Sequence, residues 1–199
     1  MKRSLNDLPA PPPGKTGWPW TVETPLAEAS ATGAEWPRIS IVTPSYNQGA
    51  FLEETIRSVL LQGYPNLEYI VMDGGSTDGS VEVLRSFGDR VQWVSQNDGG
   101  QSDAINQGFA RLGGDVLGWL NSDDTFAPGA FRTVMEFMAA HPDVALVYGD
   151  ADFIDARGNR IGRCVHVEPF EAHRPAILKT VMCDQVMGKE VVRPDALGT

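Results

Sequence analysis

The chain has 199 residues, of which 42% are hydrophobic and 21% are charged, and these values are typical of one globular domain with a substantial core. Its formal net charge of -10 argues against a nucleic-acid backbone or an anionic membrane surface as a partner, because such partners favour clustered Lys and Arg. A single nucleotide remains compatible with this charge, since one bound cation can invert the local field.

The cysteines and the hydropathy bear on the cellular compartment. Cys164 and Cys183 show neither CxxC spacing nor a neighbouring histidine pattern, which favours two reduced thiols. No stretch approaches the roughly 18 to 20 apolar residues of a membrane-spanning helix. We therefore expect a cytoplasmic protein with no membrane span, and peripheral attachment to the inner face of the membrane stays open.

Residues 1–37 differ in composition from the rest of the chain. Prolines recur there at positions 9, 11, 12, 13, 19, 25 and 37, and such density favours extended, solvated backbone. Trp18, Trp20 and Trp36 complicate this prediction, because aromatic side chains usually pack against something. We predict a flexible Pro-rich tail, with an arm docked on the domain surface as the alternative.

From Arg38 onward, strand-like and helix-like segments alternate. The apolar patterns predict strands at residues 39–43, 67–72, 91–94, 116–120 and 144–148. Helical spacing covers residues 51–60, 81–87, 102–112 and 131–138, and a hairpin is expected within 152–167. This alternation predicts an α/β fold with a Rossmann-like, mostly parallel sheet covered by helices on both faces.

The unusual residues of the sequence follow the predicted strands. Four loops carry them, at residues 43–47, 73–78, 97–103 and 121–124. Each loop alone is what an ordinary turn would use. Together they indicate a site, because ligands of open parallel sheets bind off the carboxyl ends of the strands.

A nucleotide diphosphate with a hard divalent cation suits such a site. Mg²⁺ or Mn²⁺ takes oxygen ligands, commonly one or two carboxylates plus phosphate oxygens, and Asp123 and Asp124 would supply the carboxylates. Tyr46 could pack against a base, and Asp73 could accept hydrogen bonds from a base or a ribose. No P-loop, dinucleotide fingerprint, HExxH pattern or GxSxG elbow is present.

These residues resemble the family 2 glycosyltransferases, which are inverting enzymes of the GT-A fold. The resemblance rests on four ordered segments between about residues 38 and 155: Ile41–Asn47, Asp73–Asp78, Gly100–Gly108 and Gly118–Asp124. The last segment is similar to a variant of the DxD motif in bacterial members that build cell-surface polysaccharide. Residues 38–155 would then form the nucleotide-sugar-binding half of the domain.

The resemblance implies roles for individual residues. Pro44, Ser45, Tyr46 and Asp73 would contact the nucleoside, and the loop from Gly100 to Asp103 would border the nucleotide and the donor sugar. Asn121 and Ser122 would also belong to the donor site, and Asp123 would hold the metal ion on the diphosphate. The implied partners are a nucleotide-sugar donor, with UDP-sugar favoured, and a glycan or lipid-linked acceptor.

Two positions depart from the pattern of the family. Asn121 stands where many relatives have Asp, which removes one charge from the cation site. Asp124 would compensate in part or would only cap the following turn, and both interpretations stay open. Gly74 stands where relatives often carry a second acid directly after Asp73.

The catalytic base is the part that the sequence does not supply. An inverting transfer needs a base for the acceptor proton, and relatives carry it after the fifth strand, shortly beyond a segment that Cys183–Val186 resembles. The chain ends at Thr199, so we expect a C-terminal truncation, with 156–199 as a partial acceptor-side region. Asp150, Asp152 and Asp155 are the substitutes to consider, although hydrogen bonding at a strand end and in a turn is the favoured explanation of these acids. The alternative to an active transferase is therefore a non-catalytic or truncated nucleotide-sugar-binding domain.

Overall fold

The computed structural model describes residues 4–26, 35–156, 158–164, 179–182 and 187–192. The segment Cys183–Val186, which resembles the family segment before the base, lies outside the described residues. Within the described part of the chain, no helix is long and apolar enough to cross a membrane.

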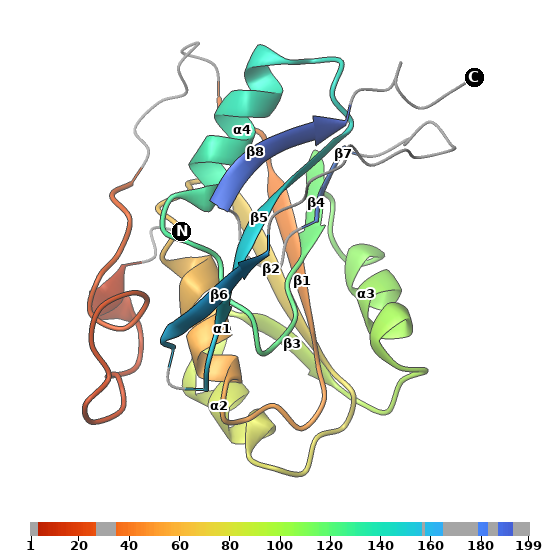
Figure 1. Cartoon of the computed structure of the whole chain (residues 1–199). Helices are drawn as coiled ribbons and strands as arrows, with labels where there is room; N and C mark the ends of the chain where they lie inside the picture. Colours follow the sequence, from red (N-terminus) through yellow and green to blue (C-terminus); the bar gives the residue numbers. More distant parts are fainter. Residues whose placement is uncertain (1–3, 27–34, 157, 165–178, 183–186, 193–199) are drawn as a thin grey trace.

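One mixed sheet organises the fold (Figure 1). Its strands are β1 (Ile39–Ser45), β2 (Leu67–Asp73), β3 (Gln92–Ser95), β4 (Val116–Trp119), β5 (Leu146–Ile154), β6 (Arg160–Cys164), β7 (Lys179–Met182) and β8 (Met187–Val192). They follow the order β3-β2-β1-β4-β7-β5-β6, and β8 pairs with β5. The neighbours from β3 to β5 are parallel, whereas β6 and β8 run antiparallel to β5.

The helices are α1 (Leu52–Leu60), α2 (Ser80–Ser86), α3 (Gln101–Phe109) and α4 (Ala130–Ala140). Figure 1 shows α3 on one side of the sheet and α1, α2 and α4 on the other. This arrangement confirms the predicted α/β class with helices on both faces, and the five predicted strands and four predicted helices all occur. The predicted hairpin is β5 with β6, and β7 and β8 were not expected.

The period of two along β1 and β2 divides the core between the two faces. Ile41 and Tyr69 point into the larger apolar cluster, under α1 and α4, whereas Val42 and Ile70 point into the smaller cluster under α3. Successive strand residues face opposite sides of a sheet, and strands buried on both faces read as continuous apolar runs. That is why Ile41 and Val42 are consecutive apolar residues, and why all seven residues of β1 are buried.

Residues 4–26, which we call the N-terminal arm, pack on the α1 side of the sheet (Figure 1). Leu8 and Trp20 are buried at 9% and 5% exposure, and Leu5 and Trp18 pack against the larger core cluster. Trp36, in the described stretch that leads into β1, is also buried. Residues 4–26 thus make the contacts expected of an arm docked on the domain, which was the alternative to a flexible tail. The domain boundary at residue 37 stays a prediction.

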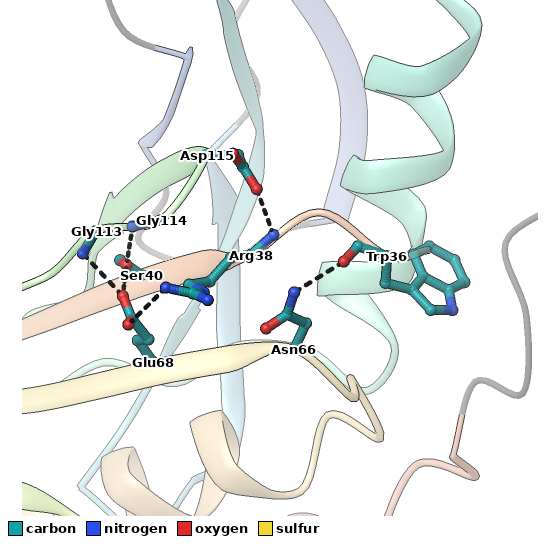
Figure 2. Close-up of polar contacts among 8 residues, drawn as sticks. All are labelled: Trp36, Arg38, Ser40, Asn66, Glu68, Gly113, Gly114 and Asp115. Atoms are coloured by element: carbon teal, nitrogen blue, oxygen red, sulfur yellow. Dashed lines mark hydrogen bonds and ion pairs between the residues drawn. The ribbon is translucent and has the colours of Figure 1, made fainter. Parts of the chain in front are cut away.

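A polar cluster joins β1, β2 and β4 where these strands begin (Figure 2). The Glu68 carboxylate accepts hydrogen bonds from the Ser40 hydroxyl at 2.7 Å and the Gly113 amide at 2.9 Å, and it pairs with Arg38 at 3.4 Å. Burial alone would raise the pKa of Glu68, but these two hydrogen bonds and the Arg38 charge lower it below its ordinary value. The cluster therefore lies at the edge of the sheet opposite to the carboxyl ends of these parallel strands.

Candidate functional site

A cavity of about 780 Å³ lies at the carboxyl ends of β1, β2 and β4. This is the edge at which open parallel sheets bind ligands. Its wall consists of Pro44, Ser45, Tyr46, Gln48, Gly74, Asn97, Asp98, Gly100, Gln101, Ala104, Asn121, Ser122 and Asp123. Seven of the predicted site residues therefore meet in one cavity: Pro44, Ser45, Tyr46, Gly100, Asn121, Ser122 and Asp123.

The first loop places Ser45 and the aromatic ring of Tyr46 in the cavity wall. Tyr46 is 64% exposed although it is aromatic, so its ring has a face open to a ligand. The Ser45 hydroxyl is buried and has no hydrogen-bond partner among the described residues. A buried hydroxyl without a partner is costly, which makes Ser45 a candidate ligand contact.

The second loop is fastened to the first by side-chain hydrogen bonds. The Asn47 amide nitrogen of the backbone donates to the Ser76 hydroxyl at 2.8 Å, and the Asn47 side-chain oxygen accepts from the Thr77 backbone at 2.9 Å. Asn47 itself has a φ of 53°, a left-handed conformation that Asn tolerates better than most residues. The contact keeps the Tyr46 loop in place beside β2.

The Asp73 carboxylate is hydrogen-bonded to neighbouring protein groups. Asp73 is 2% exposed, and its carboxylate accepts hydrogen bonds from the backbone of Gly75 and Ser76 and from the hydroxyls of Ser76 and Ser95. The carboxylate thus holds the turn after β2 behind the cavity wall. Its contact with a nucleoside stays a prediction.

Asp98 is an acid in the wall that the sequence analysis did not single out. A Cβ atom on Gly74 would lie 3.2 Å from an Asp98 carboxylate oxygen and 3.3 Å from the Tyr46 ring. Asp98 also accepts a hydrogen bond from the Gly100 amide at 2.8 Å. The Asp98 carboxylate thus lies close to Gly74 and to the Tyr46 ring, although it comes from the next loop. Only the three-dimensional structure brings these loops together.

Asp103, at the start of α3, is partly exposed and is not among the residues of the cavity wall. Its carboxylate accepts hydrogen bonds from the Gly99 backbone at 2.9 Å and from Gln107 at 2.7 Å, and these bonds lower the pKa of Asp103. Asp103 thereby holds the glycine turn before α3, in which Gly100 has a φ of 99° that favours glycine. A direct contact of Asp103 with a donor sugar stays a prediction.

A chain of side-chain hydrogen bonds crosses the floor of the site. Gln101 donates to the Asn121 side-chain oxygen at 2.6 Å, and the Asn121 side-chain nitrogen donates to the Asp124 carboxylate at 3.2 Å. The carboxylate can only accept, so the orientation of the Asn121 amide follows. Asp124 also closes a turn through its backbone nitrogen, which donates to the Asn121 carbonyl at 3.1 Å. These bonds belong to the turn Asn121–Asp124, which precedes Asp124, so both the metal contact of Asp124 and its capping of the following turn stay predictions.

Side chains of α1, and Gln62 just after it, form hydrogen bonds with the backbone of the loop after β4. The Thr55 hydroxyl lies 2.9 Å from the Ser122 carbonyl and 2.7 Å from the Asp124 carbonyl, so its single proton is shared between them. Ser58 accepts from the Phe126 amide, and Gln62 donates to the Ala127 carbonyl. Asp123 lies between the two carbonyls that Thr55 holds, and its own side chain is exposed in the wall.

The donor set in the wall suits a hard cation. Asp123 and Asp98 offer carboxylate oxygens, and Asn121 and Gln101 offer amide oxygens, which are the ligand types of Mg²⁺ and Mn²⁺. Among the described residues, no group of three or more His, Cys, Asp or Glu side chains is placed to hold a metal ion. A cation here would therefore use one or two protein carboxylates.

The three carboxylates considered as a base lie on or after β5. Asp152 pairs with Arg160 at 2.9 Å, and Asp155 accepts two hydrogen bonds from Asn159 in the hairpin turn. Asp150 lies on β5, next to β8. Asp152 and Asp155 therefore make contacts within the strand and the turn, as expected if they have a structural role and do not act as the base.

Comparisons with known proteins agree with the fold and place the chain in a family. Residues 40–192 match the model of Glycosyl transferase family 2. The chain is 36% identical over 143 residues to the O-antigen biosynthesis protein RfbC of Myxococcus xanthus, covering 69% of this chain and 11% of that protein. It is 34% identical over 129 residues to an uncharacterized glycosyltransferase of Haemophilus influenzae, covering 63% and 51%. The chain thus spans only part of the length of the relatives it matches.

Two solved structures share the fold. The mannosyltransferase PcManGT from Pyrobaculum calidifontis, in complex with GDP-Man and Mn²⁺, matches with a TM-score of 0.54 at 21% identity, covering 67% of this chain and 40% of that one. Residues 1–349 of TarS from S. aureus, in complex with UDP-GlcNAc, match with a TM-score of 0.51 at 24% identity, covering 56% and 34%. With a family model that matches most of its length and this shared fold, the chain belongs to glycosyl transferase family 2 and has the GT-A fold.

Proposed function

We propose that this protein binds a nucleoside diphosphate sugar with Mg²⁺ or Mn²⁺ and transfers the sugar, with inversion, to a glycan or lipid-linked acceptor in polysaccharide synthesis. The observation that carries the proposal is the cavity at the ends of β1, β2 and β4, where Ser45, the open Tyr46 ring and the exposed Asp123 share one wall. The polysaccharide context is supported by the likeness to the O-antigen protein of Myxococcus xanthus.

The residue types of the wall support separate binding roles for the nucleoside and for the diphosphate with its cation. In this proposal the Tyr46 ring would stack on a base, and Asp98, which like Tyr46 lies close to Gly74, would accept a hydrogen bond from the base or the ribose. Asp123, with Asn121 near it, would hold the cation on the diphosphate. UDP is the carrier that the family resemblance favours, and GDP-Man and UDP-GlcNAc are bound by two proteins of the same fold.

In the proposed reaction an acceptor hydroxyl oxygen attacks the anomeric carbon of the sugar. The bond from that carbon to the diphosphate oxygen breaks, its electron pair stays on the leaving nucleoside diphosphate, and the acceptor proton passes to a base. Bound metal would supply electrostatic stabilisation of the leaving phosphate oxygens. The residues of this chain orient the nucleotide, and residues 156–199 would contribute to the acceptor side.

A second candidate function is nucleotide-sugar binding without transfer. The contacts of Asp152 with Arg160 and of Asp155 with Asn159 favour it, because these carboxylates are held in structural interactions. Turnover separates the candidates. Release of UDP from UDP-sugars in the presence of acceptor glycans supports the transferase, whereas metal-dependent UDP binding without any turnover supports the binding domain.

The test of the donor site is calorimetric titration of UDP into the protein with and without Mn²⁺. We expect binding to require Mn²⁺, and we expect Asp123→Asn to weaken it by at least the roughly 10- to 100-fold that loss of an outer-shell metal partner costs. The matched control is Asp89→Asn, since Asp89 is an exposed acid in the 3-10 turn Gly88–Arg90, outside the cavity wall. Equal affinity in the two variants would contradict the role of Asp123.

A further inference from the structure

The N-terminal arm lies outside the residues that match the family model, yet it is attached to the loop that carries Asp123. The family match begins at residue 40, whereas the arm spans residues 4–26. The arm runs along the side of the sheet that α1 covers (Figure 1). The family match therefore says nothing of the contacts that the arm makes.

The N-terminal arm contacts α1 through the buried Arg57 side chain. Arg57 of α1 is fully buried, and it donates one hydrogen bond to the Pro9 carbonyl of the arm while it pairs with Glu53 of its own helix at 2.8 Å. The Trp20 ring lies 5.2 Å from the Arg57 guanidinium and 5.0 Å from the Lys15 amine. A buried guanidinium needs such partners, so the arm and α1 depend on one another.

The arm also fits closely against the end of α1. The Thr24 amide donates to the Leu61 carbonyl at 2.9 Å. Gly63 follows with a φ of 63°, and a Cβ atom there would collide with the Thr24 and Pro25 carbonyl oxygens. The arm is thus hydrogen-bonded or packed against α1 at several places along the helix.

From this position the arm reaches the loop after β4. The Trp18 indole nitrogen donates to the Phe126 carbonyl at 2.9 Å, and the Phe126 amide donates to Ser58 of α1 at 3.1 Å. Arm and helix therefore hold successive backbone groups of one residue, whose side chain is itself fully buried. Phe126 lies three positions after Asp123.

We infer that the N-terminal arm is a positioning element of the cavity, in which Trp18 holds the Phe126 carbonyl and thereby restricts the loop that presents Asp123. A loop stays mobile unless its backbone groups are bonded, and a carboxylate that is held before the ligand arrives binds with less loss of entropy. Trp18 acts through the loop and not by contact with a ligand. The effect on ligand binding rests on the proposed function, whereas the effect on the loop does not.

The test compares two Trp→Phe variants. Trp18→Phe keeps an aromatic ring and removes the bond to Phe126, whereas Trp36→Phe removes an indole N–H that is buried and has no partner among the described residues. Hydrogen–deuterium exchange of peptides that cover residues 121–127 is measured on the ligand-free full chain. We expect exchange to become roughly two- to tenfold faster in Trp18→Phe, as loss of one hydrogen bond predicts, and to stay unchanged in Trp36→Phe.

Titration of UDP with Mn²⁺ then measures the consequence for binding. A weaker affinity in Trp18→Phe than in Trp36→Phe, by a similar factor, supports the inference. Equal exchange of residues 121–127 in the two variants, or faster exchange with equal affinity, overturns it. If the unmodified protein itself binds no UDP with Mn²⁺, the proposed donor site fails, while the exchange comparison still decides whether the arm holds the loop.

Discussion

At the scale of single residues, the structure gives Asn121 a physical role. Its amide accepts from Gln101 and donates to Asp124, which a carboxylate at the same position could not do. An aspartate there would place two like charges within hydrogen-bond distance. The neutral residue thus lets α3, through Gln101, and the loop after β4 share one network across the floor of the cavity.

Tyr46 offers a direct residue-scale test. Its ring is 64% exposed in the cavity wall, and base–aromatic stacking is worth about 1–3 kcal/mol when the ring is replaced by alanine. We expect Tyr46→Ala to weaken UDP binding in the presence of Mn²⁺ by roughly tenfold, measured by calorimetry. Tyr46→Phe keeps the ring and should bind almost as well, so equal losses in both variants would indicate a role for the hydroxyl instead.

At the scale of elements, the packing of α3 on the sheet depends on the absence of a side chain. A Cβ atom on Gly108 would lie 2.5 Å and 2.8 Å from the two methyl groups of Val42, a buried β-branched residue of β1. Helix α3 therefore rests directly on the strand. Because α3 begins at Gln101 in the cavity wall, this approach also positions one side of the site.

We expect Gly108→Ala to lower the free energy of unfolding by about 1–3 kcal/mol, because overpacking would displace α3, even though alanine favours a helix. The measurement is denaturant unfolding followed by circular dichroism. Gly113→Ala is the matched control, since a Cβ atom there would meet nothing within 4 Å. A stabilised Gly108→Ala would show that the helix and strand have room for the methyl group.

The cluster at the other end of the sheet makes a prediction about pH. The pKa of Glu68 is lowered in the folded protein, so its contribution to stability is present above its ordinary value of 4.5 and is lost as the pH falls through the folded pKa. We expect Glu68→Gln to cost about 1 kcal/mol at neutral pH. Unfolding curves of the two proteins should converge in acid, and a difference that persists there would mean that the charge of Glu68 is not responsible.

At the scale of the whole molecule, the proline-rich N-terminus is part of the core. Trp20 is 5% exposed and contacts Lys15 and Arg57 through its ring, so its removal would leave a cavity beside a buried charge. We expect Trp20→Ala to lower the free energy of unfolding by about 3–5 kcal/mol in denaturant titrations. Val22→Ala, at a residue of the same arm that is 47% exposed, should change it by less than about 0.5 kcal/mol. Similar small changes in both would indicate a loosely attached arm.

The order of strands and helices could be predicted from the sequence because the spacing of apolar residues is a local property. Ile39 to Thr43 reads as a strand, and the pattern from Leu52 to Leu60 reads as a helix, without reference to the rest of the chain. The four loops at the strand ends could be predicted for the same reason, since Asp, Asn, Ser and Gly interrupt the apolar pattern there. The resemblance of these loops to family 2 glycosyltransferases then identified the family.

Which side chains face the cavity was decided by tertiary structure alone, because burial and hydrogen bonding depend on residues that are distant in the sequence. Asp73 and Asp98 are both acids after a strand, yet Asp73 is enclosed by the hydroxyls of its surroundings while Asp98 stands in the wall beside Tyr46. The contact of Trp18 with Phe126, across 108 positions, has no local signal either. The sequence by itself determined the fold class, the family and the loops of the site, and the packing of the chain decided which residues those loops present.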